Sequence, residues 1–137
     1  MTALILILSL IASAAPTLRA IDGTPVSLSG TTGSLAVLWS MDCAECVETM
    51  SALEDAGLPY VAINTDGAAA ISQLRSFARV HDLTAPIIVD TDGMLRRSLQ
   101  AQPAETLTID SSGAVTLRMS SHDTEALLTQ ATMVAGQ

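Results

Sequence analysis

The sequence predicts an α/β sandwich in which a central mixed β-sheet is covered by helices. Apolar runs of strand length alternate with longer segments of helical periodicity through the middle of the chain. A hairpin pattern and one further helix then close the chain. The only two cysteines, Cys43 and Cys46, have C-x-x-C spacing at the point where the first central strand meets its helix.

The first half of the chain contains a hairpin, a buried strand and a helix. Asp22-Gly23 is a turn signal, and it predicts two short strands on either side. Residues 35–40 are a continuous apolar run, which is typical of a central strand buried on both faces. A helix is predicted to begin near Cys43 and to end at Gly57, with its apolar face formed by Val47, Met50, Leu53 and Ala56.

The second half repeats this alternation. Residues 60–64 and 86–90 are predicted strands, and the segment 65–83 between them is a predicted helix capped by Thr65 or Asp66. A short helix at 94–100, a hairpin of 105–110 with 114–119, and a last helix over 122–135 complete the order. The strands 35–40 and 60–64 are expected to be parallel, because a helix crosses over between them.

Length and composition indicate a single acidic globular domain. The chain has 137 residues and a formal charge of −8, and all six of its basic residues are arginine. With one Trp, one Tyr and one Phe it lacks both the basic patches and the stacking platforms that nucleic-acid binding requires. Neutral or basic proteins are the expected partners, and the chain is expected to be a monomer.

The first residues resemble a secretory leader. The run from Ala3 to Leu8 is apolar without interruption, and Ala12-Ser13-Ala14 fits a small-residue cleavage site. The run is shorter than the roughly 20 residues that a membrane-spanning helix needs. We therefore expect residues 1–14 to be a signal peptide, residues 15–137 to be the folded domain, and the mature protein to be periplasmic or otherwise extracytoplasmic. A buried N-terminal strand or helix is the alternative.

The cysteine pair favours redox chemistry over a structural role. A bridge between Cys43 and Cys46 closes a very short loop, so it would remove little chain entropy. At a helix N-terminus, free N–H groups and the helix dipole stabilise a thiolate. Cys43 is therefore the expected attacking thiol, and Cys46, one turn further, is the expected resolving thiol.

Three stretches resemble the exported TlpA/ResA/DsbE type of thiol–disulfide oxidoreductase, which has the thioredoxin fold. They are "LRAIDGTPVSLSGTTGSLAVLWSMDCAEC", "ISQLRSFARVHDLTAPIIVDTDGML" and "ETLTIDSSGAV". The resemblance implies a thioredoxin-like three-layer sandwich with an N-terminal β-hairpin and an inserted helix–strand segment. It also implies a periplasmic dithiol that needs no cofactor beyond its redox-active disulfide. Its partners would be protein thiols or disulfides, such as an apocytochrome or a membrane electron donor.

The sequence departs from this family at positions around the predicted site. Trp39 matches the family's Trp, but Asp42 stands where the family usually has Trp before the first Cys. Val37 replaces a strand residue that is often Asn or Asp and could accept a proton from the resolving thiol. The family's cis-proline position falls on Ala104, with Pro103 one residue early, so either Pro103 is cis after a one-residue shift or the cis-proline is absent.

The acids around the cysteines have two interpretations. Asp42, Glu45 and Glu48 are compatible with the solvated start of a helix, where the dipole favours acids. Alternatively they raise the pKa of Cys43 and make the pair a reductant rather than an oxidant. The predicted residues for substrate contact or pKa tuning are therefore Trp39, Asp42, Glu45, Pro103 and Ala104.

Metal binding is the alternative from a different functional class. Cys43, Cys46, His81 and His122 are nominally a Cys₂His₂ set, but the two histidines are too far apart in sequence for a zinc finger, and both are expected at the surface. No resident metal is therefore predicted. A related class of thioredoxin-fold proteins carries Cu(I) on two cysteines and a distant histidine, usually with wider cysteine spacing. The alternatives to the enzyme are thus a Cu(I) metallochaperone and a redox-inert binding module.

Overall fold

The structure is a computed structural model and describes residues 18–28 and 34–136. The predicted signal peptide, residues 1–14, and the predicted domain start at residue 15 lie outside these ranges. Within them, no helix is both long enough and apolar enough to cross a membrane.

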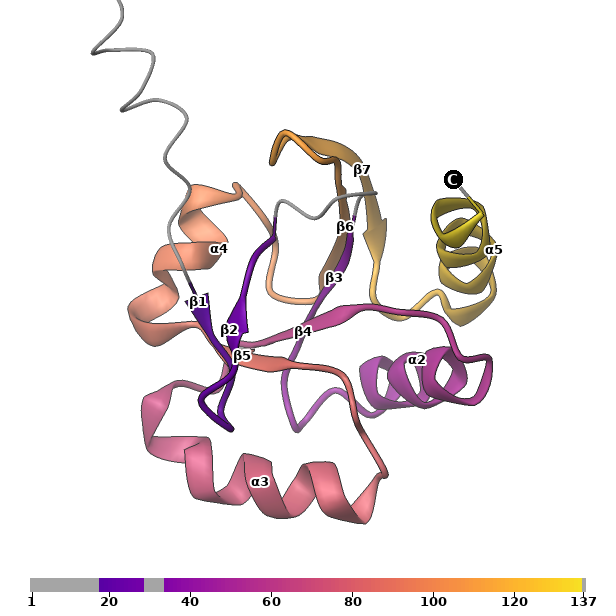
Figure 1. Cartoon of the computed structure of the whole chain (residues 1–137). Coiled ribbons are helices and arrows are strands. Elements are labelled where there is room, and N and C mark those ends of the chain that lie inside the picture. Colours follow the sequence, from indigo (N-terminus) through magenta and orange to yellow (C-terminus); the bar gives the residue numbers. More distant parts are fainter. Residues whose placement is uncertain (1–17, 29–33, 137) are drawn as a thin grey trace, which may run out of the picture.

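A five-stranded mixed sheet forms the centre of the molecule (Figure 1). Its strand order is β5-β4-β3-β6-β7. β3 (Ser34–Trp39), β4 (Val61–Asn64) and β5 (Ile87–Val89) are parallel, whereas β6 (Glu105–Ile109) and β7 (Val115–Ser120) are antiparallel to their neighbours. The predicted α/β class, the mixed sheet and the parallel pairing of the two central strands are confirmed.

The central strand β3 separates two apolar layers. Leu35, Val37 and Trp39 belong to a core that also contains residues of α2 (Ala44–Asp55), α3 (Ile71–Val80) and α5 (Thr124–Ala135). Ala36 and Leu38 belong to a second core, which α4 (Met94–Ser98) covers. Successive side chains of a strand point to opposite faces, so an uninterrupted apolar strand fills both layers.

The N-terminal hairpin lies beside β5. β1 (Leu18–Arg19) pairs with β2 (Pro25–Val26) in antiparallel register. The backbone N–H of Ile21 donates to the Ile87 carbonyl of β5 at 2.8 Å. The Thr24 N–H donates to the Asp22 carboxylate across the predicted turn. Hydrogen bonds from Thr24 also lower the pKa of the Asp22 carboxyl.

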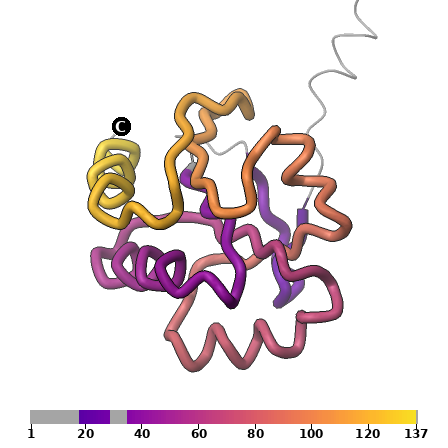
Figure 2. The backbone as a smooth tube through the Cα atoms, turned by 180° about the vertical axis from the view of Figure 1, so that it is seen from behind, coloured from indigo at the N-terminus to yellow at the C-terminus, as the bar shows by residue number. Residues whose placement is uncertain are grey.

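Helices α2 and α5 pack side by side on one face of the sheet, as both backbone views show (Figures 1 and 2). The α2 helix stops at Asp55 because Gly57 adopts a left-handed φ of +67°, which glycine tolerates without a steric penalty. This stop lets the chain turn back and enter β4 beside β3.

The predicted start of the second helix is wrong. The segment after β4 passes through Gly67, with φ of +98°, and a 3₁₀ turn at Ala68–Ala70 before α3 begins at Ile71. Asp66 does not cap this helix, because its carboxylate accepts hydrogen bonds from the Met41 backbone and the Asn64 side chain. The carboxylate therefore stabilises the loop after β3 instead.

Glu54 ties the end of α2 to the loop that enters β5. Its carboxylate accepts hydrogen bonds from the Thr84 hydroxyl at 2.6 Å, the Thr84 and Ala85 backbone N–H groups, and the Tyr60 hydroxyl. Partial burial alone would raise the pKa of Glu54, but these hydrogen bonds together lower it. The ionised carboxylate thus favours the folded state.

We expect Glu54→Gln to make stability less dependent on pH. Because the folded-state pKa lies below the unfolded value of about 4.3, the wild-type contribution is present above that pH and is lost as the pH falls through the folded pKa. The variant should lose about 1 kcal/mol at pH 7 and converge with wild type in acid, measured by urea unfolding across pH. Glu48→Gln, an exposed position on the same helix, is the control. A loss that stays constant down to pH 2 would contradict this role.

Candidate active site

Cys43 and Cys46 form a disulfide at the start of α2, with their Cα atoms 5.2 Å apart. Cys43 is the N-cap residue of this helix, and its sulfur accepts the backbone N–H of Cys46 at 3.2 Å. Cys43 is partly exposed, whereas Cys46 is completely buried. Cys43 is therefore the more accessible cysteine, which is compatible with the attacking and resolving roles expected for Cys43 and Cys46.

The loop that carries Cys43 is held by the chain segment after β4. The Met41 N–H donates to the Asp66 carboxylate at 2.9 Å, and both the N–H and the hydroxyl of Thr65 donate to the Trp39 carbonyl. Asn64, which is fully buried, donates its amide to the same Asp66 carboxylate at 2.8 Å. These contacts fix the four residues between the end of β3 and the start of α2.

A group of buried hydroxyls fixes the opposite side of the site. The Ser121 hydroxyl donates to the Leu38 carbonyl of β3 at 2.9 Å and contacts the Thr106 hydroxyl of β6 at 2.8 Å. The Thr49 hydroxyl of α2 donates to the Ser121 carbonyl at 2.8 Å. Ser121, Thr49 and Thr106 are all essentially inaccessible to solvent. The turn between β7 and α5 is therefore attached to both β3 and α2.

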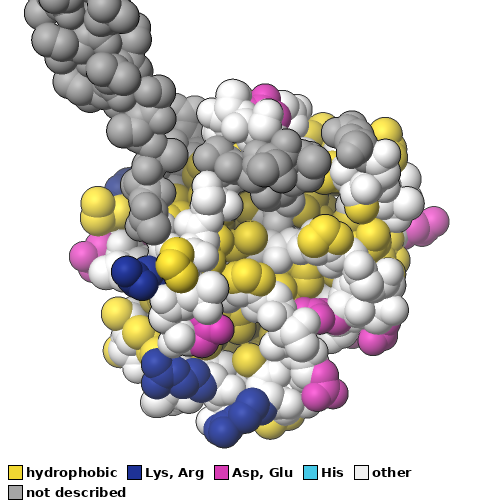
Figure 3. Space-filling model, in the orientation of Figure 1, with side chains coloured by type: hydrophobic (Ala, Val, Ile, Leu, Met, Phe, Trp, Pro, Cys, Tyr) yellow, Lys and Arg dark blue, Asp and Glu magenta, His cyan; other side chains and the backbone are white. Residues whose placement is uncertain are grey.

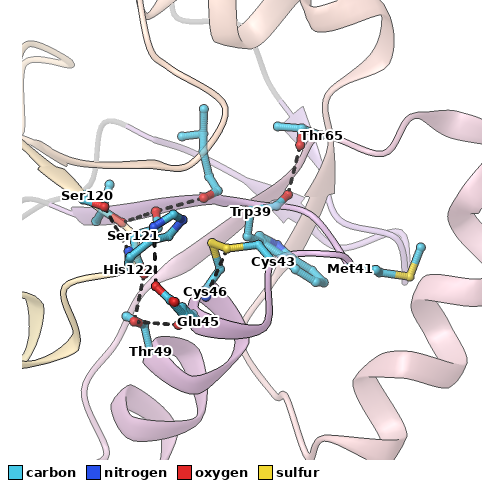
Figure 4. Close-up of a disulfide and its surroundings, with 12 residues drawn as sticks. Trp39, Met41, Cys43, Glu45, Cys46, Thr49, Thr65, Ser120, Ser121 and His122 are labelled. Atoms are coloured by element: carbon cyan, nitrogen blue, oxygen red, sulfur yellow. Dashed lines mark hydrogen bonds and ion pairs between the residues drawn. A yellow bond between two sulfur atoms is a disulfide. The ribbon is translucent and has the colours of Figure 1, made fainter.

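This attachment places His122 beside the disulfide (Figure 4). One ring nitrogen of His122 and the two cysteine sulfurs all lie within 4.8 Å of one another. The Nδ1 atom of the imidazole is 3.6 Å from a carboxylate oxygen of Glu45. The sequence analysis placed His122 at the surface, which is confirmed, but it did not predict this proximity. His81 is not part of this group; its ring lies tilted against Phe77 at a centroid distance of 4.2 Å.

A groove between α2 and α3 begins next to Cys43. It has a volume of about 530 Å³ and is lined by Met41, Ala44, Val47, Glu48, Ser51, Ala52, Asp55, Phe77 and His81. Five of these lining residues are apolar, and the carboxylates of Glu48 and Asp55 contribute negative charge. Figure 3 shows carboxylates on the side of the molecule where α2 lies, whereas arginines lie over α3.

The predicted site residues occupy different environments. Trp39 is completely buried and its ring packs near Phe77, with centroids 5.5 Å apart, so it belongs to the core. Asp42 and Glu45 are exposed beside the cysteines. Val37 is fully buried, in keeping with its apolar character. Roles in pKa tuning stay predictions for these residues.

The segment before β6 differs from the family pattern. No cis peptide bond occurs in residues 18–28 or 34–136, so Pro103 is trans, and of the two alternatives the structure has the one without a cis-proline. Pro103 is exposed, whereas Ala104, like Cys43, packs against the core that includes Cys46. The Ala104 carbonyl accepts the Ser121 N–H at 2.8 Å. Substrate contact by either residue stays a prediction.

Comparisons with known proteins identify the fold. No family model matches the sequence, and no curated protein matches it. Among solved structures, StoA from Bacillus subtilis is similar with a TM-score of 0.71 and 18% identity, covering 88% of this chain and 97% of that chain.

Two further solved structures are similar to this chain over most of its length. A secreted Mycobacterium tuberculosis disulfide oxidoreductase homologous to E. coli DsbE has a TM-score of 0.65 and 16% identity, with 87% of this chain and 96% of that chain covered. The pneumococcal exposed lipoprotein thioredoxin Etrx1 from Streptococcus pneumoniae has a TM-score of 0.65 and 18% identity, with 88% and 99% covered.

The chain is therefore a thioredoxin-fold protein with a C-x-x-C disulfide at the start of helix α2. The fold implied by the sequence resemblance to the TlpA/ResA/DsbE type is confirmed.

We expect Ser121→Ala to destabilise the protein by about 1–3 kcal/mol, because it leaves the buried Thr106 hydroxyl and Leu38 carbonyl without their shared partner. Denaturant unfolding measures this loss. Ser98→Ala, at an exposed position of α4, should change stability by less than about 0.5 kcal/mol. Equal stabilities of the two variants would show that the hydroxyl group does not hold the turn.

Proposed function

We propose that the protein is an exported thiol–disulfide oxidoreductase that reduces disulfides in protein substrates. The observation that carries this proposal is the disulfide between the partly exposed Cys43, whose sulfur accepts a helix N–H, and the fully buried Cys46. This arrangement favours attack by the first thiol and intramolecular release by the second.

The reaction has two exchange steps. In the reduced protein, the Cys43 thiolate attacks one sulfur of a substrate disulfide, and the other substrate sulfur leaves as a thiolate. Cys46, after losing its proton, then attacks the Cys43 sulfur of the mixed disulfide and releases the second substrate thiolate. The substrate gains two electrons and the protein becomes the Cys43–Cys46 disulfide. A dithiol donor, such as a membrane electron donor, must reduce it again, and no cofactor beyond the disulfide is involved.

The surrounding charges support the reducing direction. The helix N-terminus and the Cys46 N–H favour a thiolate at Cys43, but Asp42 and Glu45 beside it oppose an additional negative charge. Less stabilisation of the thiolate favours the disulfide form of the couple, so the dithiol gives up its electrons more readily.

The groove between α2 and α3 suggests the class of substrate. Its apolar lining next to Cys43 suits an extended apolar segment, and Glu48 and Asp55 suit a basic side chain on that segment. A net charge of −8 would likewise attract basic proteins and repel acidic ones. We therefore propose substrates with apolar and basic residues around the disulfide; an apocytochrome is one such partner.

Export is part of the proposal. It is supported by the apolar leader pattern of residues 1–14 and by two similar structures, one of a secreted protein and the other of an exposed lipoprotein. Extracytoplasmic localisation would place the pair where disulfides form and persist.

A trapping experiment tests the enzyme proposal. Wild-type protein with a recycling dithiol should reduce a peptide disulfide catalytically, whereas Cys46→Ala should stop after one exchange and accumulate a mixed disulfide at Cys43, identified by mass spectrometry. Cys43→Ala is the matched control and should form no such adduct. If the wild type gives no turnover and Cys46→Ala gives no adduct, the proposal fails.

The same assay tests the proposed substrate class. Two peptide disulfides of equal length, one with Arg and Leu next to the cysteines and one with Glu and Leu, should differ in rate, with the basic peptide faster. The difference should shrink in Glu48→Gln/Asp55→Asn protein and at high salt. Equal rates for both peptides would show that the groove does not select basic substrates, but they would not contradict the proposed exchange reaction.

A further inference from the structure

We propose that the reduced Cys43–Cys46 pair and His122 form a binding site for a single Cu(I) ion. The three donors come from two distant parts of the chain, the start of α2 and the turn before α5. Their ligand atoms already lie within 4.8 Å of one another, close enough for one ion to contact all three. This inference uses the dithiol form of the pair and is otherwise independent of disulfide turnover.

The histidine is held in position by its neighbours. Ser121 before it is fully buried and bonded to β3, and Asp123 after it caps α5 by accepting the Ala126 N–H at 3.2 Å. The His122 backbone also participates, since its N–H donates to the Ser120 hydroxyl and its carbonyl accepts the Thr124 N–H. The imidazole therefore does not have to be recruited from a mobile segment, which lowers the entropic cost of binding.

Glu45 supplies the second contact that a metal-binding histidine usually has. Its carboxylate lies 3.6 Å from Nδ1 of His122, which leaves Nε2 as the ring nitrogen available to an ion. Figure 4 shows the imidazole next to both Glu45 and the disulfide, whereas Met41 points away from the sulfurs. The negative charge of Glu45 and of the neighbouring Asp42 also favours a cation over a neutral ligand.

The donor set selects Cu(I) rather than Zn²⁺. Two thiolates and an imidazole are soft to intermediate ligands, which suit Cu(I). A structural zinc site needs four protein ligands in tetrahedral geometry, and the group found in the described part of the chain has three. A three-ligand site at the surface, where the side chain of His122 is 48% exposed, is compatible with binding and release of the ion.

Binding of the ion depends on the redox state of the cysteines. Cu(I) binding displaces the thiol protons of Cys43 and Cys46 to solvent and leaves the oxidation states of copper and sulfur unchanged. In the disulfide form each sulfur is bonded to the other, so no thiolate is available. Copper binding and disulfide exchange therefore compete for the same two sulfurs, and copper would inhibit exchange.

The test is a competition titration of anaerobic, fully reduced full-length protein with Cu(I) bound to the chromophoric chelator bicinchoninate. Wild-type protein should withdraw one equivalent of Cu(I), and the disulfide form should withdraw none. Loss of an outer contact to a metal ligand typically costs 10–100-fold in affinity, so His122→Ala, which removes a ligand itself, should weaken binding by at least about tenfold. His81→Ala is the matched control and should bind like wild type. X-ray absorption of the wild-type complex should show two sulfur ligands and one nitrogen ligand.

Two results would overturn the proposal. One is unchanged Cu(I) affinity in His122→Ala, because the imidazole would then not be a ligand. The other is binding of Zn²⁺ but not Cu(I) by the reduced protein, because the ion would then be wrongly assigned. Turnover of peptide disulfides by protein that binds no Cu(I) would leave the oxidoreductase proposal standing, whereas Cu(I) binding without turnover would support the metal site alone.

Discussion

The candidate site depends on how strand β3 passes into helix α2. β3 is buried on both faces, and the chain leaves it at Trp39 and begins α2 at Ala44 with Cys43 as the N-cap. The cap position gives the Cys43 sulfur a backbone N–H to accept, while the helical turn brings Cys46 underneath. The geometry of one strand–helix connection thus determines which sulfur faces solvent and which is shielded.

Two distant loops keep that connection in place. Asp66, after β4, binds the backbone on one side of Cys43, and Ser121, after β7, is attached to β3 and α2 on the other. The second loop also carries His122 to the disulfide. The polar side chains near the cysteines, Asp66 and His122, therefore follow the ends of other strands of the same sheet, as is common for sites in open α/β sheets.

The sequence predicted the strands, α2 and the cysteine arrangement because these features are local. A continuous apolar run, a C-x-x-C at its end and the Gly57 stop are read from adjacent residues. It did not predict the start of α3, since Asp66 has capping character but uses its carboxylate for a partner 25 residues away. Nor did it predict the proximity of His122, because that depends on buried hydroxyl contacts of Ser121 that join residues up to 83 positions apart.

The acids beside the cysteines are the feature that distinguishes this site from the usual electropositive surroundings of a reactive thiol. On the proposed function, their negative charge opposes the helix N-terminus at Cys43, and the balance of the two effects would set the redox direction. The reduction potential of the Cys43–Cys46 couple, measured in defined thiol–disulfide buffers, tests this balance most directly. We predict a value nearer to that of thioredoxin, about −270 mV, than to that of the oxidant DsbA, about −120 mV. A potential at the oxidising end of this range would contradict the proposal that the protein is a reductant.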